Sequence, residues 1–503
     1  MAEPVRRPPA APPAPPESAP DRRLFALGVV VVLGTLLTSL STTIINVATR
    51  TLGSEFGAPL TTIQWVLTGY LLAFASTIPV AGWASERFGA RRVWIAALLL
   101  FTVGSALCGL SWSAGALIAF QVLRGIGAGL ILPVGQGILA QAAGPRRMGR
   151  VIGMIAVPLL MGSLIGPVIG GLIISTAGWR WIFLLNLPLG LLAVLTARRL
   201  MPKSAPQPGN RLDLRGLLLL CVGVAVFIYG TSEAGLRGGL GSPHAVIGLA
   251  AGTVLIALYV VHARGRRHRA LIDVMLFRER AFMASASTNL MLSVTRFGVL
   301  ILMPLYWQIL RGQSPLTTGV LLIPQTLGAA AAMPLGGWVV DRAGPRVVVP
   351  SGILIGMLGA LAYSQLGADT PVMVCSGALF LIGLGLGVAV VPATVTAYVT
   401  LPNPAIPRAT CAINTIQQLG ASIGTALLAV VLQRSITAEA PELGPSALGA
   451  LPSHARDALV PALERAFGQA FWVAAALIAV TLIPAMLLPR RSSVTRRSAV
   501  AEG

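Results

Sequence analysis

The chain has 503 residues, of which 55% are hydrophobic and 11% charged, and its mean hydropathy is +0.81. This composition excludes a soluble domain with one buried core and predicts a polytopic membrane protein. The net charge of +21 does not indicate a nucleic-acid partner, because 36 of the 37 basic residues are arginines scattered through short loops. Such an excess is typical of loops retained on the cytoplasmic side of a membrane.

The chain begins with a proline-rich segment that carries four arginines and no apolar stretch, so residues 1–23 are predicted to be a disordered cytoplasmic tail without a signal peptide. A bilayer core requires about 20 apolar residues per helix. We count fourteen such runs, with approximate limits 24–48, 63–84, 93–112, 114–141, 151–176, 181–200, 214–232, 244–263, 282–309, 317–340, 347–366, 372–400, 410–433 and 467–488. With the N-terminus inside, the cytoplasmic tails and loops carry 28 basic residues and the outer loops seven, which predicts a cell-membrane protein with both termini in the cytoplasm.

Two polar segments between apolar runs are copies of each other at an offset of 255 residues. Gly82, Glu86, Arg87, Gly89 and Arg91 in the first copy correspond to Gly337, Asp341, Arg342, Gly344 and Arg346 in the second. A second repeat has nearly the same offset and consists of Gly125, Gly127 and Gly129 followed by Gly383, Gly385 and Gly387. The chain is therefore predicted to contain two related halves, which is how secondary transporters are built.

Eight apolar runs, the third to the tenth, separate the two polar copies, where a duplication of six-helix halves requires six. Runs seven and eight are assigned to an insertion, since an even number of extra helices keeps both halves in the same orientation. The predicted domains are an N-terminal half at 24–200, an inserted pair with its linker at 201–263, a basic cytoplasmic loop at 264–281, a C-terminal half at 282–488 and a cytoplasmic tail at 489–503. Residues 434–466 are predicted to form an outer loop with one short helix near 453–465.

Four further segments complete the pattern of motifs: LSTTIINVA at 40–48, QWVLTGY at 64–70, WRWIFLLNLP at 179–188 and NTIQQLG at 414–420. With the duplicated segments, they make residues 24–488 resemble the major facilitator superfamily, and more closely its fourteen-span drug:proton antiporters of the EmrB/QacA type. The resemblance implies an all-α integral membrane protein with the major facilitator fold, in which 14 transmembrane helices are arranged as 6+2+6.

The duplicated polar segments are predicted to act in gating at the cytoplasmic face. In the first copy, Gly89 permits a tight turn, while Arg87 and Arg91 lie near helix C-termini and lipid phosphates. The alternative is that these charges only anchor a loop. Because acid and arginine recur in both halves, a shared gating role is favoured.

The fifth apolar run contains Gly162, Gly166 and Gly170 at four-residue spacing, with Pro167 and Gly171 beside them. Glycines at this spacing lie on one helix face and let a neighbouring helix approach closely, while the proline permits a bend. The segment resembles the antiporter signature of the family, which is associated with exporters. Plain close packing is the alternative interpretation.

Two departures from the family pattern bear on the mechanism. Ser41 stands where these antiporters usually carry an aspartate, and Gln121 and Arg124 stand where they usually read Arg-x-x-Gln-Gly. No carboxylate falls in the middle of a predicted span, but Arg124 and Arg296 do. Because an intramembrane charge is costly and usually faces a partner or a water-filled cavity, both arginines are candidate functional residues.

Further polar residues of the spans are predicted to line the same cavity, although each could instead make only hydrogen bonds between helices: Asn46, Gln121, Asn289, Gln417 and Gln418. If the protein couples to protons, Glu55 and Glu233 at the outer surface are the candidate proton acceptors. The four cysteines fall within apolar runs without close pairing and are expected to be packing residues rather than metal ligands.

The leading interpretation is export of a small, largely apolar molecule, such as a drug, an antibiotic or a secondary metabolite, by alternating access. The resemblance implies proton-coupled efflux, whereas arginines without buried acids favour potential-driven export of an anionic metabolite. A sensor that binds without transporting is a further alternative. No metal-ligand spacing or nucleophile–base set appears in the spans, so an enzyme is not expected. We expect no cofactor beyond an ion gradient or membrane potential, a small-molecule substrate and membrane lipids as partners, no nucleic acid, and a functional monomer.

Overall fold

The structure is a computed structural model that describes residues 20–143, 162, 166, 169–203, 206, 212–236, 239, 241–266, 270–399, 401–439 and 453–489. All regular elements within these ranges are helical. Twelve of the described helices are long and apolar enough to cross a membrane, and a bent pair brings the number to thirteen. The fifth predicted run, at 151–176, lies mostly outside the described residues.

The N-terminal half consists of seven described helices, whose long apolar stretches match the predicted runs: α1 (Pro20–Phe56), α2 (Leu60–Thr77), α3 (Val80–Phe88), α4 (Ala90–Gly109), α5 (Ala114–Ala143), α7 (Trp181–Leu184) and α8 (Asn186–Leu200). The predicted run at 63–84 corresponds to a bent span, in which α2 and α3 meet at an angle of 57°. Pro79 lies at this break, and its ring removes a backbone donor and disfavours a continuous helix.

The inserted segment comprises α9 (Leu214–Leu217), the π-helical turn η1 (Leu218–Val222), α10 (Gly223–Leu236) and α11 (Pro243–Arg264). The C-terminal half follows with η2 (Val274–Arg278), α12 (Arg280–Leu305), η3 (Tyr306–Leu310), α13 (Pro315–Leu321), α14 (Ile323–Ala343), α15 (Pro345–Tyr363), α16 (Val372–Val399), η4 (Asn403–Ala405), α17 (Ile406–Glu439) and α18 (Ser453–Met486). The helix predicted near 453–465 is present, but it is the beginning of α18, which is continuous from Ser453, and α17 extends to Glu439 within the predicted loop. Further along α18, Glu464 accepts a hydrogen bond from the Ala368 backbone at 2.6 Å.

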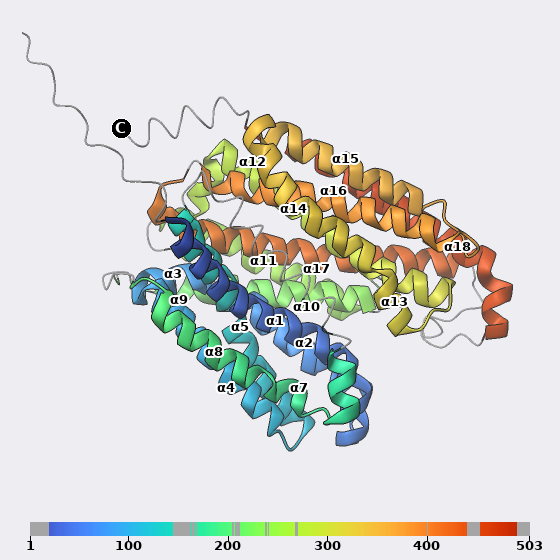
Figure 1. Cartoon of the computed structure of the whole chain (residues 1–503), viewed down its shortest axis with the longest axis horizontal. Helices are drawn as coiled ribbons and strands as arrows, with labels where there is room; N and C mark the ends of the chain where they lie inside the picture. The colour runs from blue at the N-terminus through green and yellow to red at the C-terminus, as the bar shows by residue number, and fades with distance from the viewer. Residues whose placement is uncertain are drawn as a thin grey trace, which may run out of the picture.

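The two halves lie on either side of the inserted pair and α17 (Figure 1). Helices α14, α15, α16 and α18 lie on one side, and α1, α4 and α8 on the other. We call the end of the bundle where α3 turns into α4 at Gly89 and α14 into α15 at Gly344 the repeat end. At this end α17 packs against α3 and α5, and the ribbons of the halves diverge toward the opposite end (Figure 1).

The inserted helix α10 touches both halves. On one side the hydroxyls of Thr231 and Ser422 form a hydrogen bond between α10 and α17. On the other side Tyr229 stacks on Trp65 of α2, with ring centroids 6.0 Å apart. The inserted pair therefore lies along the seam between α2 of the N-terminal half and α17 of the C-terminal half.

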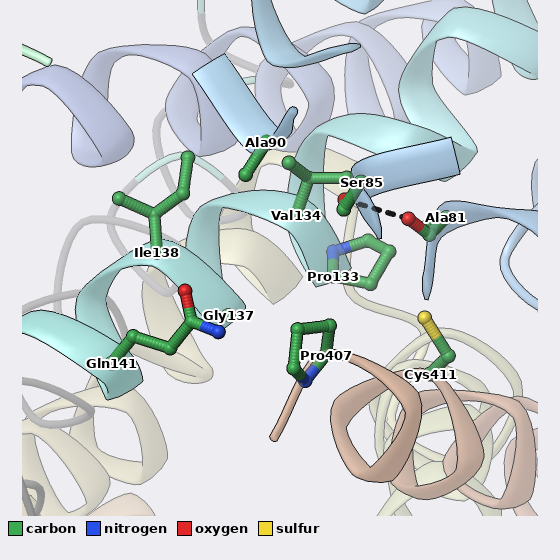
Figure 2. A pocket seen from close by; sticks show the side chains of 10 residues that line it. All are labelled: Ala81, Ser85, Ala90, Pro133, Val134, Gly137, Ile138, Gln141, Pro407 and Cys411. Atoms are coloured by element: carbon green, nitrogen blue, oxygen red, sulfur yellow. Dashed lines mark hydrogen bonds between the residues drawn. The ribbon is translucent and has the colours of Figure 1, made fainter. Parts of the chain in front are cut away.

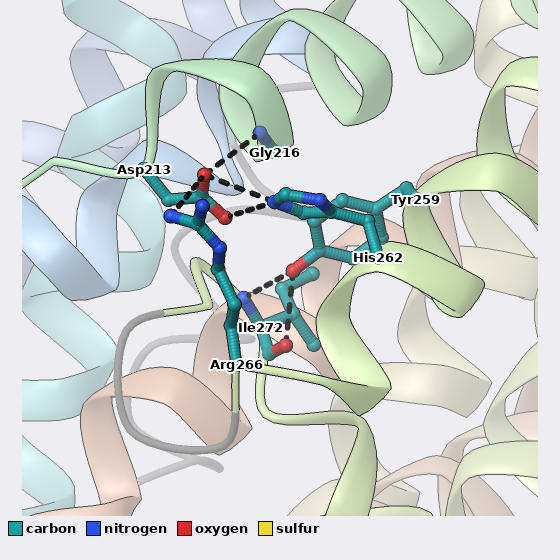
Figure 3. A network of polar contacts seen from close by, with 6 residues as sticks. All are labelled: Asp213, Gly216, Tyr259, His262, Arg266 and Ile272. Atoms are coloured by element: carbon teal, nitrogen blue, oxygen red, sulfur yellow. Dashed lines mark hydrogen bonds and ion pairs between the residues drawn. The ribbon is translucent and has the colours of Figure 1, made fainter.

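A polar network fastens the inserted pair at the repeat end (Figure 3). Asp213, just before α9, is buried, and its carboxylate oxygens lie 2.9 and 3.1 Å from Nε2 of His262 on α11. Arg266 adds a longer ion pair of 3.9 Å to the same carboxylate. Nearby, the Tyr259 hydroxyl donates to the Ile272 carbonyl and accepts from the Ile272 amide, which ties α11 to the segment that leads into α12.

The duplicated glycines pack helix backbones together in both halves. A Cβ atom on Gly125 or Gly129 would lie within 3.0 Å of backbone atoms of α2, and one on Gly127 within 3.0 Å of α4. In the second copy, Gly383 approaches α14 in the same way and Gly385 approaches α15. Small residues allow such contact between membrane helices, which lack a hydrophobic driving force for association. Thus α5 and α16 are the equivalent central helices of two related halves.

We predict that Gly383→Ala destabilises the protein by about 1–3 kcal/mol, because its new methyl group would overlap backbone atoms that cannot rotate away. The measurement is the thermal unfolding midpoint of the purified protein in detergent. Gly377→Ala on the same helix is the matched control, since its Cβ would meet no atom within 4 Å. Equal midpoints for the two variants would contradict the packing assignment.

Candidate functional site

A salt bridge joins the two halves at the repeat end. Glu86, in the last turn of α3, accepts hydrogen bonds from Nε and Nη2 of Arg408, in the first turn of α17, at 2.8 and 2.7 Å. The two side chains are only 12% and 14% exposed. A bidentate, charge-assisted pair of this kind is both strong and geometrically specific. Glu86 was predicted from the repeat, whereas its partner Arg408 was not.

Close helix packing and a second polar contact between the halves lie near the Glu86–Arg408 pair. A Cβ atom on Gly82 would lie 3.3 Å from both Cα of Arg408 and Sγ of Cys411, so α3 and α17 touch along their backbones. One turn further into the bundle, the Asn414 amide of α17 donates to the Gln136 amide oxygen of α5 at 2.7 Å. The repeat end is thus closed by an ionic layer and a neutral layer, both formed between the halves.

A small pocket lies in the same seam, between α3, α4, α5 and α17 (Figure 2). Its walls come from both halves: Ala81, Ser85, Ala90, Pro133, Val134, Gly137, Ile138, Gln141, Pro407 and Cys411. The space that the centre of a water-sized sphere can enter is only about 10 Å³, which is about what one water molecule requires. The pocket is therefore a packing defect of the closed seam rather than a substrate site.

The second copy of the polar segment forms the same turn. Gly344 has a φ of +80° and Gly89 a φ of +86°, a conformation that favours glycine and explains its recurrence. Arg342 and Arg346 are exposed, and the side chain of Asp341 lies outside the described residues. A salt bridge between the halves is thus described for the first copy alone.

The other predicted gating arginines of the first copy lie beside Glu86. Arg91 donates through Nη2 to the Arg198 carbonyl near the end of α8, where a cation also favours the negative end of the helix. The Arg87 side chain is half-buried in the last turn of α3. These contacts anchor the turn within the N-terminal half.

Arg124 lies at the centre of a buried polar cluster in the N-terminal half. Its side chain is fully buried, and Nη1 donates to the Gln121 amide oxygen at 2.9 Å. Three aromatic rings surround the guanidinium, with centroids 5.1 Å away for Tyr70, 5.0 Å for Phe101 and 5.5 Å for Phe183. The exchange of glutamine and arginine relative to the family pattern thus keeps both groups in one cluster.

Ser41, the residue at the aspartate position of the family, is also buried. Its hydroxyl donates to the Asn186 side chain at 3.1 Å, and Asn186 in turn donates to the Ile182 carbonyl at 3.3 Å. This contact links α1 to the break between α7 and α8, next to Phe183 of the arginine cluster. Asn186 is a polar residue that sequence reasoning did not single out, and the side chain of Asn46 lies outside the described residues.

In the C-terminal half, Asn289 of α12 links three helices. Its side-chain oxygen accepts hydrogen bonds from Thr394 of α16 at 2.8 Å and from Gln417 of α17 at 2.9 Å. Two of the predicted cavity residues are therefore brought into contact with each other. Arg296, two helical turns further along α12, keeps a half-exposed side chain that stacks on Phe297 at 4.7 Å.

The glycines of the antiporter signature approach α1. A Cβ atom on Gly162 would lie 3.0 Å from Oγ of Ser39, and one on Gly170 would lie 3.0 Å from Cγ2 of Ile44. Gly166 is buried, Gly171 meets no atom within 4 Å, and Pro167 lies outside the described residues. Gly162 and Gly170 thus pack closely against α1.

The two candidate proton acceptors differ in their surroundings. Glu55, near the end of α1, forms an ion pair of 3.1 Å with Arg180, and both side chains are more than 40% exposed. Glu233 lies on α10 with intermediate exposure. Their roles stay predictions.

Comparison with known proteins agrees with this architecture. Residues 31–425 match the family model described as Major Facilitator Superfamily. The chain belongs to this superfamily. Relatives include the Multidrug resistance protein B homolog of Mycobacterium tuberculosis (strain H37Rv), 38% identical over 96% of this chain and 93% of that protein. A Putative multidrug resistance protein MdtD of Escherichia coli is 31% identical over 80% of this chain and 85% of that protein.

Solved structures of other superfamily members share the fold. The human organic anion transporter MFSD10 superposes with a TM-score of 0.60 at 16% identity, covering 92% of this chain and 99% of that chain. The proton:xylose symporter XylE gives a TM-score of 0.61 at 15% identity, covering 92% of this chain and 95% of that chain. The protein is thus a membrane transporter of the major facilitator superfamily and not an enzyme.

We predict that Glu86→Gln shifts the equilibrium toward states open at the repeat end by about tenfold or more, because a hydrogen bond to a charged group is worth about 1.5–3 kcal/mol. The measurement is the distance between spin labels at Arg92 and Arg346, exposed residues of the two halves, after the native cysteines are replaced. The label distances should lengthen and broaden.

Glu439→Gln is the matched control for this prediction, because it weakens an ion pair with the exposed Arg465 within the C-terminal half that is worth at most about 1 kcal/mol. Its distance distribution should equal that of the unsubstituted protein. An unchanged distribution in Glu86→Gln would show that the salt bridge does not control the closed state.

Proposed function

We propose that the protein exports a small, largely apolar molecule across the cell membrane by alternating access. The observation that carries this proposal is the Glu86–Arg408 pair, which bridges the two halves at one end of the bundle. A central cavity can open at that end only if this pair separates, so its making and breaking would accompany each transport cycle. The printed names of the relatives, which are multidrug resistance proteins, support export of drug-like molecules.

The proposal includes an orientation of the protein in the membrane and a number of transmembrane helices. The repeat end is placed in the cytoplasm, because the loops assigned to that side carry most of the arginines. The thirteen described spans and the run at 151–176 would together make fourteen, arranged as 6+2+6. In this orientation the structure is closed toward the cytoplasm. A functional monomer surrounded by lipid, with an ion gradient or the membrane potential as the energy source, completes the proposal.

Proton coupling is the first candidate for the driving force. It follows the family pattern, with Glu55 or Glu233 taking the role of the absent aspartate at position 41. Both lie toward the opposite end of the bundle, where access to water makes a carboxylate less costly than in the membrane interior.

Potential-driven export of an anion is the second candidate, and a specific observation favours it. Neither Arg124 nor Arg296 has a carboxylate partner among the described residues. A guanidinium stays protonated in proteins, so it can hold an anion but cannot be the group that exchanges protons. An anion leaving a negative-inside cell gains about 2.3 kcal/mol per 100 mV, or roughly fiftyfold in concentration ratio.

Flux into proteoliposomes tests the transport proposal. We expect Glu86→Asn to slow efflux of a lipophilic cationic dye or an aromatic carboxylate by about tenfold, the factor that one lost charge-assisted hydrogen bond implies. Asp341→Asn is expected to slow efflux as well, because the repeat preserves an acid at this position. Both variants should insert into the membrane normally. Binding of these probes without flux in the unsubstituted protein would favour a sensor over a transporter. Normal flux in both variants would make the repeat a folding feature.

A second flux experiment separates the two driving forces. The pH gradient is collapsed while the membrane potential is clamped negative inside. Anion export should continue at its original rate under this clamp, whereas proton antiport should stop. Loss of export under the clamp, together with loss of export in Glu55→Gln or Glu233→Gln, would reject the anion mechanism.

A further inference from the structure

The internal repeat allows the buried arginine cluster of the N-terminal half to be compared with the equivalent position in the C-terminal half. At the offset of 258 residues that relates Gly125 to Gly383, Arg124 corresponds to Ile382 and Gln121 to Leu379. Their surroundings correspond as well, because a Cβ on Gly104 would lie 3.0 Å from Cβ of Arg124, and one on Gly359 would lie 2.7 Å from Cγ1 of Ile382. Both Ile382 and Leu379 are fully buried. The C-terminal half therefore builds the same helix packing with aliphatic residues alone.

The aromatic walls of the cluster are also particular to the N-terminal half. Tyr70 corresponds to Gln325 and Phe101 to Gly356, at the offset of 255 that relates α2 to α14 and α4 to α15. The backbone of Tyr70 contacts Gly125 as that of Gln325 contacts Gly383. The charge, the amide and the two rings are thus additions to a scaffold that packs without them.

The polar groups of this cluster are not satisfied by the described residues. Nε and Nη2 of Arg124 are buried without a hydrogen-bond partner, and so is Nε2 of Gln121. Cation–π contacts contribute about 0.5–2 kcal/mol each, whereas burial of an isolated ion costs far more than three such contacts return. A buried guanidinium in this setting requires a negative partner.

We propose that the Arg124 cluster binds a monovalent anion, either an inorganic halide or the carboxylate of a transported molecule. The free guanidinium nitrogens and the Gln121 amide donate to it, and the surrounding rings exclude water, which strengthens the charge–charge interaction. This site rests on the second candidate function, since it names where the exported anion would bind. Binding can nevertheless be measured without flux, so the two proposals can fail separately.

The competing explanation is a purely structural arginine, and Gln121→Glu separates the two. This nearly isosteric change places a fixed carboxylate 2.9 Å from Nη1, where it supplies the missing negative charge permanently. A structural arginine would be stabilised by the new ion pair without any effect on anion response. At an anion site the change would also remove the Gln121 amide that donates to the ligand, and the fixed negative charge would repel the anion.

The experiment measures the thermal unfolding midpoint of the purified full-length protein in chloride, benzoate or isethionate, a bulky sulfonate that is neither a halide nor a carboxylate, at constant ionic strength. We expect chloride or benzoate to raise the midpoint by about 2 °C or more over isethionate. This rise should vanish in Gln121→Glu and in the double variant Gln121→Leu with Arg124→Ile, which copies the second repeat. Arg180→Gln, which alters an exposed arginine, should keep the response.

Each outcome decides between the alternatives. A response to chloride alone identifies an inorganic counter-ion, and a response to benzoate alone identifies a carboxylate site. No anion response in the unsubstituted protein overturns the proposal, whether or not the variants fold. An equal response in Gln121→Glu also overturns it. Flux of the aromatic carboxylate without this binding signature would reject the site while leaving the transport proposal intact.

Discussion

Backbone-to-backbone packing of the central helices is the constraint on which the rest of the structure depends. In each half, glycines at two-residue spacing leave no room for side chains between α5 and its neighbours α2 and α4, or between α16 and its neighbours α14 and α15. Interfaces of this kind resist deformation, because any shift creates overlap between atoms that cannot rotate away. We therefore expect each half to behave as a stiff body, so that the conformational change of the proposed transport cycle takes place at the seam between the halves.

The contacts in that seam have the character that a reversible interface needs. The Glu86–Arg408 pair is strong but retains partial exposure, so water can solvate both charges when the pair separates. Amide–amide contacts such as Asn414 with Gln136 are individually worth about 1 kcal/mol. A fully buried ion pair would instead leave an uncompensated charge on opening. The contacts in the seam thus define one closed arrangement of the halves, and breaking them requires only a modest free energy.

Much of the fold could be predicted from the sequence, because the length of the apolar runs and the two internal repeats can be recognised without knowing which residues contact each other. The angle of the break at Pro79 and the partner of Glu86 could not be. The proline signals a break, but its angle of 57° is set together with the packing of α3 against α17, and Arg408 lies 322 residues from Glu86 in the chain. Sequence gives the charge of Arg408 but no reason to pair it with one acid. For the same reason Asn289 and Gln417 were expected in a cavity, while their contact with each other was not foreseen.

The two halves show how a duplicated scaffold can divide its tasks. Helix packing is shared, since the glycines of α5 and α16 meet equivalent neighbours. Charge is not shared, because Arg124 stands in one half where Ile382 stands in the other. A buried charge without a partner lowers stability, so folding alone leaves the cost of Arg124 uncompensated. On the proposed anion site, the asymmetry is a specialisation, in which the N-terminal half carries the electrostatic contact to a ligand and the C-terminal half supplies the Arg408 side of the salt bridge across the seam.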